Sequence, residues 1–458
     1  MIASKQPRFI LPVCAVAVLL LVGDFLLASD WPRFRGPNGS GISPDSEPAP
    51  VTWSATENLK WTIDLPGPGS SCPIVVGDKV FVTCWSGYGL DRNEPGDQVN
   101  LKRHLVCVNR STGEVIWDQA VDPYLPEEEY GGMFAEHGYT SHTPVSDGEK
   151  VFAFFGKTGV VAVDMQGKKL WQVAVGTESG VHGWGSASSP VLVNNLVIVP
   201  ATAESHSLVA LDKETGKVVW NQEAQGFEAT WGTPVLVDAP DNKQEIILGV
   251  PGELWAFKPE DGKLKWYSQG SGGNAYCSSV IVEDGIVYAL GGREGGTVAV
   301  KAGGSGDVSE THLLWSGSQR GGIGTPLIHE GLIYWIGRDI ANCISATDGE
   351  EVYQQRLEAP ATDDQPASDP PAEEPGGGRR RGGFMNQSYS SAVAADGKLY
   401  FVTRRGLCYV VKLGAEFEQL AVNDFGDPGA DFSATPAVSN GELFVRSSKK
   451  LYCVAQQK

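Results

Sequence analysis

The stretch LVALDKETGKVVW, Leu208 to Trp220, predicts a short strand, a tight turn and a second strand that ends at Trp220. Side chains before the turn alternate with the period of two that is typical of a strand. In the turn, the side chains of Asp212 and Thr215 can bond nearby backbone N–H groups, and Gly216 can adopt a positive φ without steric cost. The chain repeats this unit, and repetition on this scale determines the fold.

Further copies of the unit read CVNRSTGEVIW at 107–117, AVDMQGKKLW at 162–171, AFKPEDGKLKW at 256–266 and CISATDGEEVY at 343–353. Each repeat opens upstream with a Ser/Thr-Pro-hydrophobic strand and a Gly-Asp type of turn. The residue at the proline position recurs at 73, 144, 190, 234, 279, 326, 392 and 436. Eight units of about 45 residues are typical of a β-propeller. The sequence therefore predicts an all-β fold over residues 30–457, a single eight-bladed β-propeller of four-stranded antiparallel blades.

The two ends of the chain are expected to close this ring. The eighth repeat ends at Leu451 to Val454 with only three strands, whereas Asn58 to Thr62 reads as a fourth strand that has no first three. Pairing the N-terminal strand with the last blade leaves no unpaired edge inside the ring.

One large aromatic side chain recurs at the end of nearly every repeat. We expect each of them to pack against a neighbouring blade and to bury its ring. Their role is then structural, and they do not stack on a cofactor. These blade-docking residues are Trp61, Trp117, Trp171, Trp220, Trp266, Trp315 and Tyr353.

Seven cysteines follow the N-terminal leader, and none is adjacent to another or part of a CxxC motif. Cys107, Cys343 and Cys453 occupy a repeat position that is alanine elsewhere, which indicates small buried residues between packed sheets. Cys72 and Cys84 flank the turn at Gly77 and could face each other across a hairpin, but a disulfide there depends on a register that the sequence leaves open.

Residues 1–29 resemble an export signal, with Lys5 and Arg8 before an apolar run and small residues at Ala28 and Ser29. We therefore expect an exported protein, periplasmic or extracellular; an uncleaved N-terminal anchor is the alternative. No later segment is long and apolar enough to predict a membrane span. The net charge of −19 and the pI near 4.8 argue against nucleic acids and anionic membrane surfaces as partners. We expect a monomer.

Insertions interrupt two of the repeats. Residues 85–104 and 118–138 lie within or just after the first blade, and residues 358–385 separate the sixth blade from the seventh. The third segment is rich in Pro, Gly and acidic residues and shows no periodicity, so we expect a disordered insertion within the propeller. It could hang over the central mouth; the simpler interpretation is a tolerated surface insertion.

The pattern AxDxxTGxxxW, complete at Ala210, Asp212, Thr215, Gly216 and Trp220, resembles the tryptophan-docking motif of the pyrroloquinoline-quinone (PQQ) repeat family. This family includes eight-bladed quinoprotein alcohol dehydrogenases and the non-enzymatic outer-membrane assembly scaffold BamB. The opening WPRFRGPNGSG at Trp31 is also similar to the start of exported PQQ-like propellers of planctomycete-type bacteria. The resemblance covers the mature chain, and its motif is specific for the fold and not for an activity.

The same resemblance implies what an enzyme of the family would need. Such enzymes carry PQQ under a disulfide between adjacent cysteines, a Ca²⁺ held by Glu and Asn, and a catalytic Asp. This sequence has no adjacent cysteines, and no Glu/Asn/Asp trio can be assigned to the matching positions. PQQ with Ca²⁺ therefore remains a cofactor implied by resemblance only, and the quinone-free scaffolds match better.

A ligand is expected at the mouth formed by the loops just before each first strand, where a ring of connections converges. The candidate residues are Glu136, His137, Tyr139, His182, Trp184, Glu228, Trp231, Asn274, Tyr276, Arg320, Asn386, Tyr389 and Asp431, with Phe432 beside the last. Aromatic faces among charged groups would suit a planar acid, a sugar or a peptide. Glu136 and Asp431 could bind a cation, and His137 could carry a proton. Alternatively, these side chains hold neighbouring loops together.

The sequence leaves three functions open. The favoured one is an exported, non-catalytic binding or assembly scaffold for a protein or small ligand at the central mouth. The second is a PQQ- and Ca²⁺-dependent oxidoreductase, and the third is a carbohydrate-binding or carbohydrate-active propeller. No catalytic residue can be assigned from sequence alone.

Overall fold

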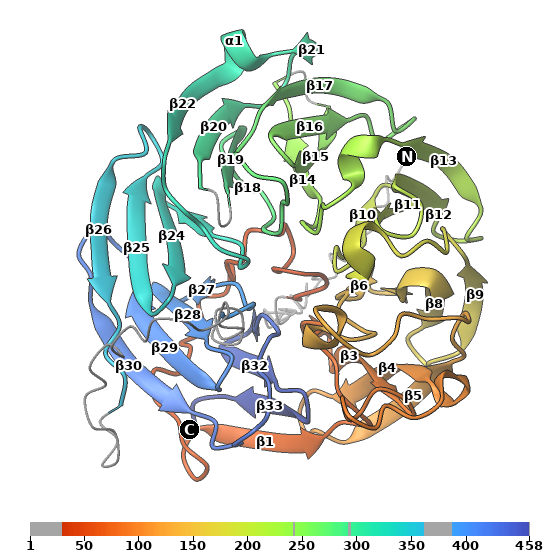
Figure 1. Ribbon diagram of the computed structural model, residues 1–458. Coiled ribbons are helices and arrows are strands. Elements are labelled where there is room, and N and C mark those ends of the chain that lie inside the picture. Colours follow the sequence, from red (N-terminus) through yellow and green to blue (C-terminus); the bar gives the residue numbers. More distant parts are fainter. Residues whose placement is uncertain (1–29, 241–242, 292–294, 361–386, 458) are drawn as a thin grey trace, which may run out of the picture.

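Eight sheets stand around a central axis in the computed structural model, which describes residues 30–240, 243–291, 295–360 and 387–457 (Figure 1). The predicted eight-bladed, all-β propeller is confirmed, because every blade contains four antiparallel strands. The predicted signal peptide at 1–29, and all but the first three residues of the 358–385 insertion, lie outside the described residues.

Each blade runs from an inner strand to an outer one. The inner strands are β2 (Ile74–Val76), β6 (Val145–Ser146), β10 (Val191–Val193), β14 (Val235–Asp238), β18 (Ile281–Glu283), β23 (Leu327–His329), β27 (Val393–Ala395) and β31 (Ala437–Ser439). The second strands are β3 (Lys79–Ser86), β7 (Lys150–Phe154), β11 (Leu196–Ala201), β15 (Gln244–Val250), β19 (Ile286–Leu290), β24 (Leu332–Gly337), β28 (Lys398–Val402) and β32 (Glu442–Arg446).

The outer half of each blade completes the sheet. The third strands are β4 (Lys102–Asn109), β8 (Val160–Asp164), β12 (Ser207–Asp212), β16 (Glu253–Phe257), β20 (Thr297–Lys301), β25 (Ile340–Ser345), β29 (Leu407–Lys412) and β33 (Lys450–Val454). The outer strands are β5 (Val115–Val121), β9 (Lys169–Val173), β13 (Val218–Glu223), β17 (Leu264–Gln269), β22 (Leu313–Gly317), β26 (Glu351–Arg356), β30 (Gln419–Asp424) and β1 (Leu59–Asp64). Inner strands are mostly buried, whereas outer strands alternate between buried and exposed positions, so the core lies between blades.

The ring closes as predicted, because the N-terminal strand β1 is the outer strand of the eighth blade. It pairs antiparallel with β33, and Trp61 lies opposite Cys453. Each end of the chain therefore completes the sheet that the other end leaves open, which removes an exposed strand edge.

The turn at Asp212 has the predicted chemistry. The carboxylate of Asp212 accepts hydrogen bonds from the backbone N–H of Glu214 at 3.1 Å and of Thr215 at 2.8 Å. Gly216 adopts a φ of +70°. The prediction that the second strand ends at Trp220 is wrong, because β13 continues to Glu223 and pairs with β12 as far as Ser207.

The positive φ of Gly216 has a packing consequence as well. A Cβ at this position would lie 2.8 Å from the ring of Trp171, which belongs to the preceding blade. The indole N–H of Trp171 donates to the carbonyl of Lys213 at 3.1 Å. The indoles of Trp61, Trp117, Trp220 and Trp315 also donate to a turn carbonyl of the following blade, at 2.9 to 3.2 Å. Each of these rings therefore couples two blades.

Trp266 and Tyr353 are buried, but their contacts differ from those of the five indoles above. Trp266 is fully buried, but its indole donates to Glu245 of its own blade at 2.8 Å. The fifth blade has a longer excursion instead of a tight turn between β20 and β22, and its short strand β21 (Gly306–Asp307) pairs with β17 beside Trp266; helix α1 (Ser309–His312) follows. Tyr353 packs against Phe417 of the seventh blade, with ring centroids 5.6 Å apart.

A closed circle of hydrogen bonds surrounds the central axis. Just before each inner strand, a backbone N–H donates to the side chain at the same position of the next blade, at 2.8 to 3.2 Å. The accepting residues are Cys72, Thr143, Ser189, Thr233, Ser279, Thr325, Ser391 and Thr435. Seven are hydroxyls, and the sulfur of Cys72 closes the circle by accepting from Thr435. The recurrent Ser/Thr of the sequence repeat therefore joins neighbouring blades.

We expect Thr233→Val to lower the free energy of unfolding by about 1–3 kcal/mol. Valine keeps the shape of threonine but leaves the N–H of Ser189, which is buried, without an acceptor. Urea unfolding followed by tryptophan fluorescence measures the change, with Thr347→Val on an exposed turn as the control. Equal urea midpoints for the two variants would show that the circle contributes nothing to stability.

The segment before β1 crosses the middle of the ring (Figure 1). Trp31 pairs with Val75 in the first blade, and the carbonyl of Pro32 accepts from Ser146 in the second. Further on, Ser43 donates to Ala394 in the seventh blade. Between these contacts lies Arg35, which is 1% exposed and donates to five carbonyl oxygens, those of Gly39, Ser40, Thr325, Pro326 and Ala392. The side of the ring that carries the turns between first and second strands is thus covered by the chain's own N-terminal segment.

Candidate functional site

The opposite side of the ring, here called the mouth face, carries the connections between blades and between second and third strands. Four charged side chains from four blades form a chain across it, here called the mouth network: Arg92, Glu136, Arg404 and Asp431. Glu136 lies 2.5 Å from Arg92 and 2.6 Å from Arg404. Arg404 also donates to Asp431 at 2.5 Å. Because Glu136 precedes the second blade and Arg404 belongs to the seventh, their ion pair joins blades that are not neighbours.

Glu136 and Arg404 stabilise each other's charged forms. Partial burial opposes ionisation of Glu136, but hydrogen bonds and charge from Arg92 and Arg404 hold its pKa below its usual range. Burial also disfavours the charged form of Arg404, but the carboxylates of Asp431 and Glu136 outweigh this effect and raise the pKa of Arg404. The Arg404 guanidinium also lies over the ring of Tyr389, 5.2 Å from the centroid. The sequence analysis placed Glu136, Tyr389 and Asp431 at the mouth but missed Arg404 and Arg92, because both lie in loops after second strands.

His137 connects two loops. Its Nδ1 is 2.8 Å from the hydroxyl of Ser141, and its Nε2 is 2.7 Å from the carbonyl of Trp184. Burial lowers the pKa of His137, so the imidazole is neutral at pH 7 and both nitrogens have partners. His137 thus holds neighbouring loops together, the second of the two roles considered from the sequence. No free nitrogen remains to carry a proton to a ligand.

Aromatic side chains form the neighbouring part of the mouth face. Trp184 and Trp231 lie with their rings 5.6 Å apart, and the indole of Trp231 donates to the carbonyl of Gly185 at 2.9 Å. The backbone N–H of Trp231 donates to the carbonyl of Tyr276, in the connection to the fifth blade, at 2.8 Å. Tyr276 is buried. These contacts hold the third, fourth and fifth blades in register at the mouth.

The other predicted mouth residues are dispersed. Glu228 lies 3.4 Å from His206, and Asn274 and Arg320 are exposed. Tyr139 is buried, and its hydroxyl donates to the carbonyl of Glu128 at 2.6 Å. His182 falls in the 3-10 helix η4 (Val181–Gly183), its side chain is not described, and Asn386 lies outside the described residues.

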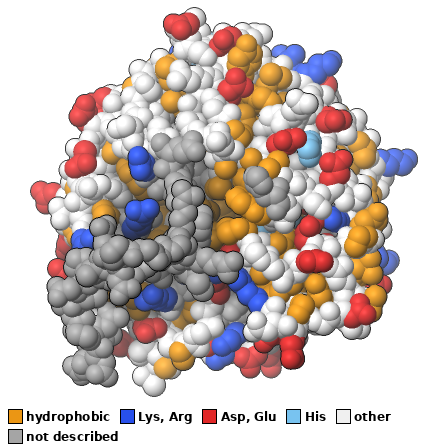
Figure 2. Space-filling model, in the orientation of Figure 1, with side chains coloured by type: hydrophobic (Ala, Val, Ile, Leu, Met, Phe, Trp, Pro, Cys, Tyr) orange, Lys and Arg blue, Asp and Glu red, His pale blue; other side chains and the backbone are white. Residues whose placement is uncertain are grey.

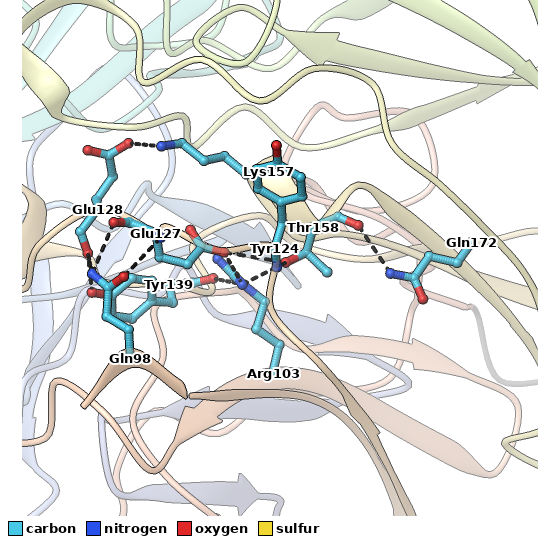
Figure 3. A network of polar contacts seen from close by, with 9 residues as sticks. All are labelled: Gln98, Arg103, Tyr124, Glu127, Glu128, Tyr139, Lys157, Thr158 and Gln172. Carbon is cyan, nitrogen blue, oxygen red and sulfur yellow. Dashed lines mark hydrogen bonds and ion pairs between the residues drawn. The ribbon is translucent and has the colours of Figure 1, made fainter. Parts of the chain in front are cut away.

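A second polar cluster lies off the axis, between the first three blades, and the sequence analysis named only Tyr139 among its residues. Figure 3 shows Arg103 pointing toward Glu127 and Thr158, and Lys157 pointing toward Glu128. Arg103 and Glu127 are each 3% exposed at the side chain and lie 2.5 Å apart. Lys157 and Glu128 lie 2.7 Å apart. The Arg103–Glu127 pair ties the loop between β5 and β6 to the first blade, and the Lys157–Glu128 pair ties it to the second.

Beside these pairs is a small crevice whose free space measures about 30 Å³. At its floor the hydroxyl of Ser186 lies 2.5 Å from Oε1 of Glu204 and 2.8 Å from Nε2 of His142. All three side chains are at least nine-tenths buried. Oε2 of Glu204 and Nδ1 of His142 have no hydrogen-bond partner. Burial raises the pKa of Glu204 to about 7 and lowers that of His142 to about 3.

This cluster is no catalytic triad, because the serine and not the histidine lies in the middle. A nucleophilic serine requires an imidazole that accepts its proton and is itself oriented by a carboxylate. Here Ser186 donates directly to Glu204, which leaves the imidazole as a donor to the serine oxygen.

The residues at the mouth do not fit PQQ with Ca²⁺. A calcium ion requires six to eight oxygen ligands, but the carboxylates of Glu136 and Asp431 both bind Arg404, whose positive charge opposes a cation between them. Among the residues that the structure describes, no group of three or more His, Cys, Asp and Glu side chains could hold a metal ion. The seven described cysteines are free thiols, including Cys72 and Cys84. Cys107, Cys343 and Cys453 are buried between sheets, as predicted.

Curated dehydrogenases are similar to parts of this chain. A polyvinylalcohol dehydrogenase of Pseudomonas sp is 26% identical over 305 residues, which cover 47% of this chain and 47% of that protein. The quinoprotein alcohol dehydrogenase PedH of Pseudomonas putida is 32% identical over 155 residues, which cover 30% of this chain and 24% of that protein. This chain thus spans half or less of the length of these relatives. Within the described residues, no helix has the length and apolar character needed to cross a membrane.

Among solved structures, BamB from Moraxella catarrhalis has the same fold. It superposes with a TM-score of 0.56 at 12% identity, over 87% of this chain and 97% of that one. Residues 101–355, more than half of the sequence, match the family described as outer membrane protein assembly factor BamB. The chain therefore belongs to the BamB family of PQQ-repeat β-propellers, which is related to the quinoprotein dehydrogenases.

Proposed function

We propose that this protein is an exported, non-catalytic propeller that holds a protein or small ligand at its mouth face. The observation that carries this proposal is the double use of Arg404, which pairs with both carboxylates that could otherwise serve a cation or a reaction. His137 adds to the argument, because both of its nitrogens are engaged in bonds between loops. The groups that could perform chemistry at the mouth are thus used to fix its shape, which suits recognition.

The mouth face offers a surface for such recognition. The rings of Trp184 and Trp231 lie side by side, Tyr389 stacks with Arg404, and Arg320 is exposed. On the face shown in Figure 2, hydrophobic side chains gather beside the centre of the ring, next to charged side chains. Aromatic and arginine side chains are enriched where proteins bind one another.

A photoreactive amino acid at Asn274 tests this placement. Asn274 is exposed at the mouth, so illumination of cells that export the full chain is expected to give one adduct of defined mass. The same amino acid at Val219, which is 51% exposed on the outer strand β13, serves as the control. In a Trp231→Ala variant the adduct at Asn274 is expected to be lost. Equal labelling at both positions, or an Asn274 adduct that persists in Trp231→Ala, would contradict a binding site at the mouth.

The similarity to quinoprotein dehydrogenases favours a second candidate, a PQQ-dependent oxidoreductase. Incubation of the purified chain with PQQ and Ca²⁺ decides between the two. We expect no stoichiometric binding by calorimetry, no quinone absorbance after gel filtration and no dye-linked alcohol oxidation, with an apo quinoprotein alcohol dehydrogenase as the positive control. A retained one-to-one quinone would overturn the non-catalytic proposal. Binding to a glycan array would instead support the carbohydrate alternative, which the Trp184 and Trp231 pair suits.

A further inference from the structure

The crevice between the first three blades lacks one positive charge. Two of its carboxylates have their own cations, since Glu127 pairs with Arg103 and Glu128 pairs with Lys157. Glu178 at the exposed rim lies 3.4 Å from His206. Glu204 at the floor is 3% exposed; the hydroxyl of Ser186 and its own backbone N–H stabilise its carboxylate, and among the described residues no Lys or Arg forms an ion pair with it. A buried carboxylate without a counter-ion is costly, because burial disfavours its charge.

Hydrogen-bond donors are also missing at the floor. Glu204 accepts the proton of Ser186 on Oε1, so the serine oxygen must accept from Nε2 of His142. That tautomer leaves Nδ1 of His142 as an acceptor. Nδ1 and Oε2 of Glu204 are therefore two buried acceptors without a donor, and both residues line the same crevice.

A positively charged donor would satisfy both deficits. The free space of about 30 Å³ is large enough for a water-sized group, and an ammonium group is of similar size. Phe134, Tyr139 and Phe155 line the walls, and aromatic rings attract an ammonium group.

We propose that this crevice binds a primary ammonium group, with Glu204 as its counter-ion and His142 as a second acceptor. The group is supplied either by a free amine or by a lysine side chain of a partner. The site is separate from the mouth network, so it goes beyond the proposed function and would remain if the mouth were found to bind a quinone.

Titration calorimetry on the full chain with n-butylamine, with n-butanol as its neutral counterpart, tests the site. We expect saturable binding of the amine and none of the alcohol. Glu204→Gln is expected to weaken amine binding at least tenfold, whereas Glu223→Gln, exposed on the outer strand β13, leaves it unchanged. Equal binding of amine and alcohol, no binding of either, or an unchanged affinity in Glu204→Gln would overturn the proposal.

A measurement on the unmutated chain guards against a variant that does not fold. Glu204 must lose its proton to serve as a counter-ion, and its pKa is raised to about 7. The affinity for n-butylamine is therefore expected to be roughly tenfold higher at pH 8 than at pH 6, although the amine stays protonated at both. The facing groups are Arg103, Glu127, Glu128, Lys157, Glu178, His142 and His206. An affinity that does not change with pH would contradict the role of Glu204.

The source of the ammonium group is resolved by a second pair of ligands. Nα-acetyl-lysine amide represents a lysine in a protein, and its Nε-acetylated form lacks the charge. Tighter binding of the lysine amide than of n-butylamine supports a partner protein, and the reverse order supports a free amine. Binding of the Nε-acetylated form as tightly as of the charged one would exclude ammonium recognition.

Discussion

Replacing Arg35 with alanine is expected to lower the free energy of unfolding by about 3–5 kcal/mol. The Arg35 guanidinium is buried in the centre of the ring and donates to carbonyl oxygens of its own segment and of the sixth and seventh blades. Alanine leaves those carbonyls without donors, and it leaves a cavity the size of a long side chain. It also removes the main polar link that holds the N-terminal segment in the ring.

The effect of Arg35 can be separated from a general effect of charge. Arg35→Lys keeps the charge but cannot reproduce the fork of donors, so an intermediate loss is expected. Arg356→Ala, exposed at the end of β26, is the matched control. Urea unfolding gives the free energies, and limited proteolysis reports release of residues 30–57. An Arg35→Ala protein that unfolds at the urea concentration of the control would refute the role of this side chain.

The second large effect is expected at the buried ion pair of Arg103 and Glu127. Arg103→Met should cost about 3–5 kcal/mol, because it leaves the Glu127 carboxylate buried without its cation. The same change removes the donor to Thr158 at 2.8 Å and to the carbonyl of Tyr139 at 3.2 Å. Release of the insertion that carries Glu127 is the expected structural consequence.

A double-mutant cycle isolates this pair. Glu127→Gln in the Arg103→Met background removes the orphaned charge, so the double variant is expected to be more stable than Arg103→Met alone. Lys102→Met, which removes an exposed partner of Asp122, is the control and should change stability by less than about 1 kcal/mol. Additive losses in the cycle would show that the two side chains do not depend on each other.

The mouth and the crevice show why function was harder to predict than fold. Glu136 and Asp431 are separated by almost three hundred positions, and Arg404 reaches Glu136 only because closure of the ring brings the mouth-face loops of the second and seventh blades together. The same holds for Glu204 and His142, which come from different blades. Spacing along the chain says nothing about such pairs, so a list of loop residues mixed those that meet with those, such as Asn274, that remain exposed.

The sequence by itself determined the blade, the number of blades and the closure of the ring. Each blade depends on local contacts, such as those in the turn of Asp212 and Gly216, and such contacts are formed by residues that are close in the sequence. The period of the repeat then counts the blades, and the two incomplete ends predict their own pairing.

Only the tertiary structure decided what lies in the centre and on the mouth face. The path of the N-terminal segment, the partners of Arg35 and the role of Cys72 in the hydrogen-bond circle all involve residues that are hundreds of positions apart. The contacts of the N-terminal segment and of Arg35 have no period and no motif, because each is made once, by side chains that the curvature of the whole ring places within bonding distance. The circle follows the Ser/Thr repeat, and only its closing contact at Cys72 departs from that repeat.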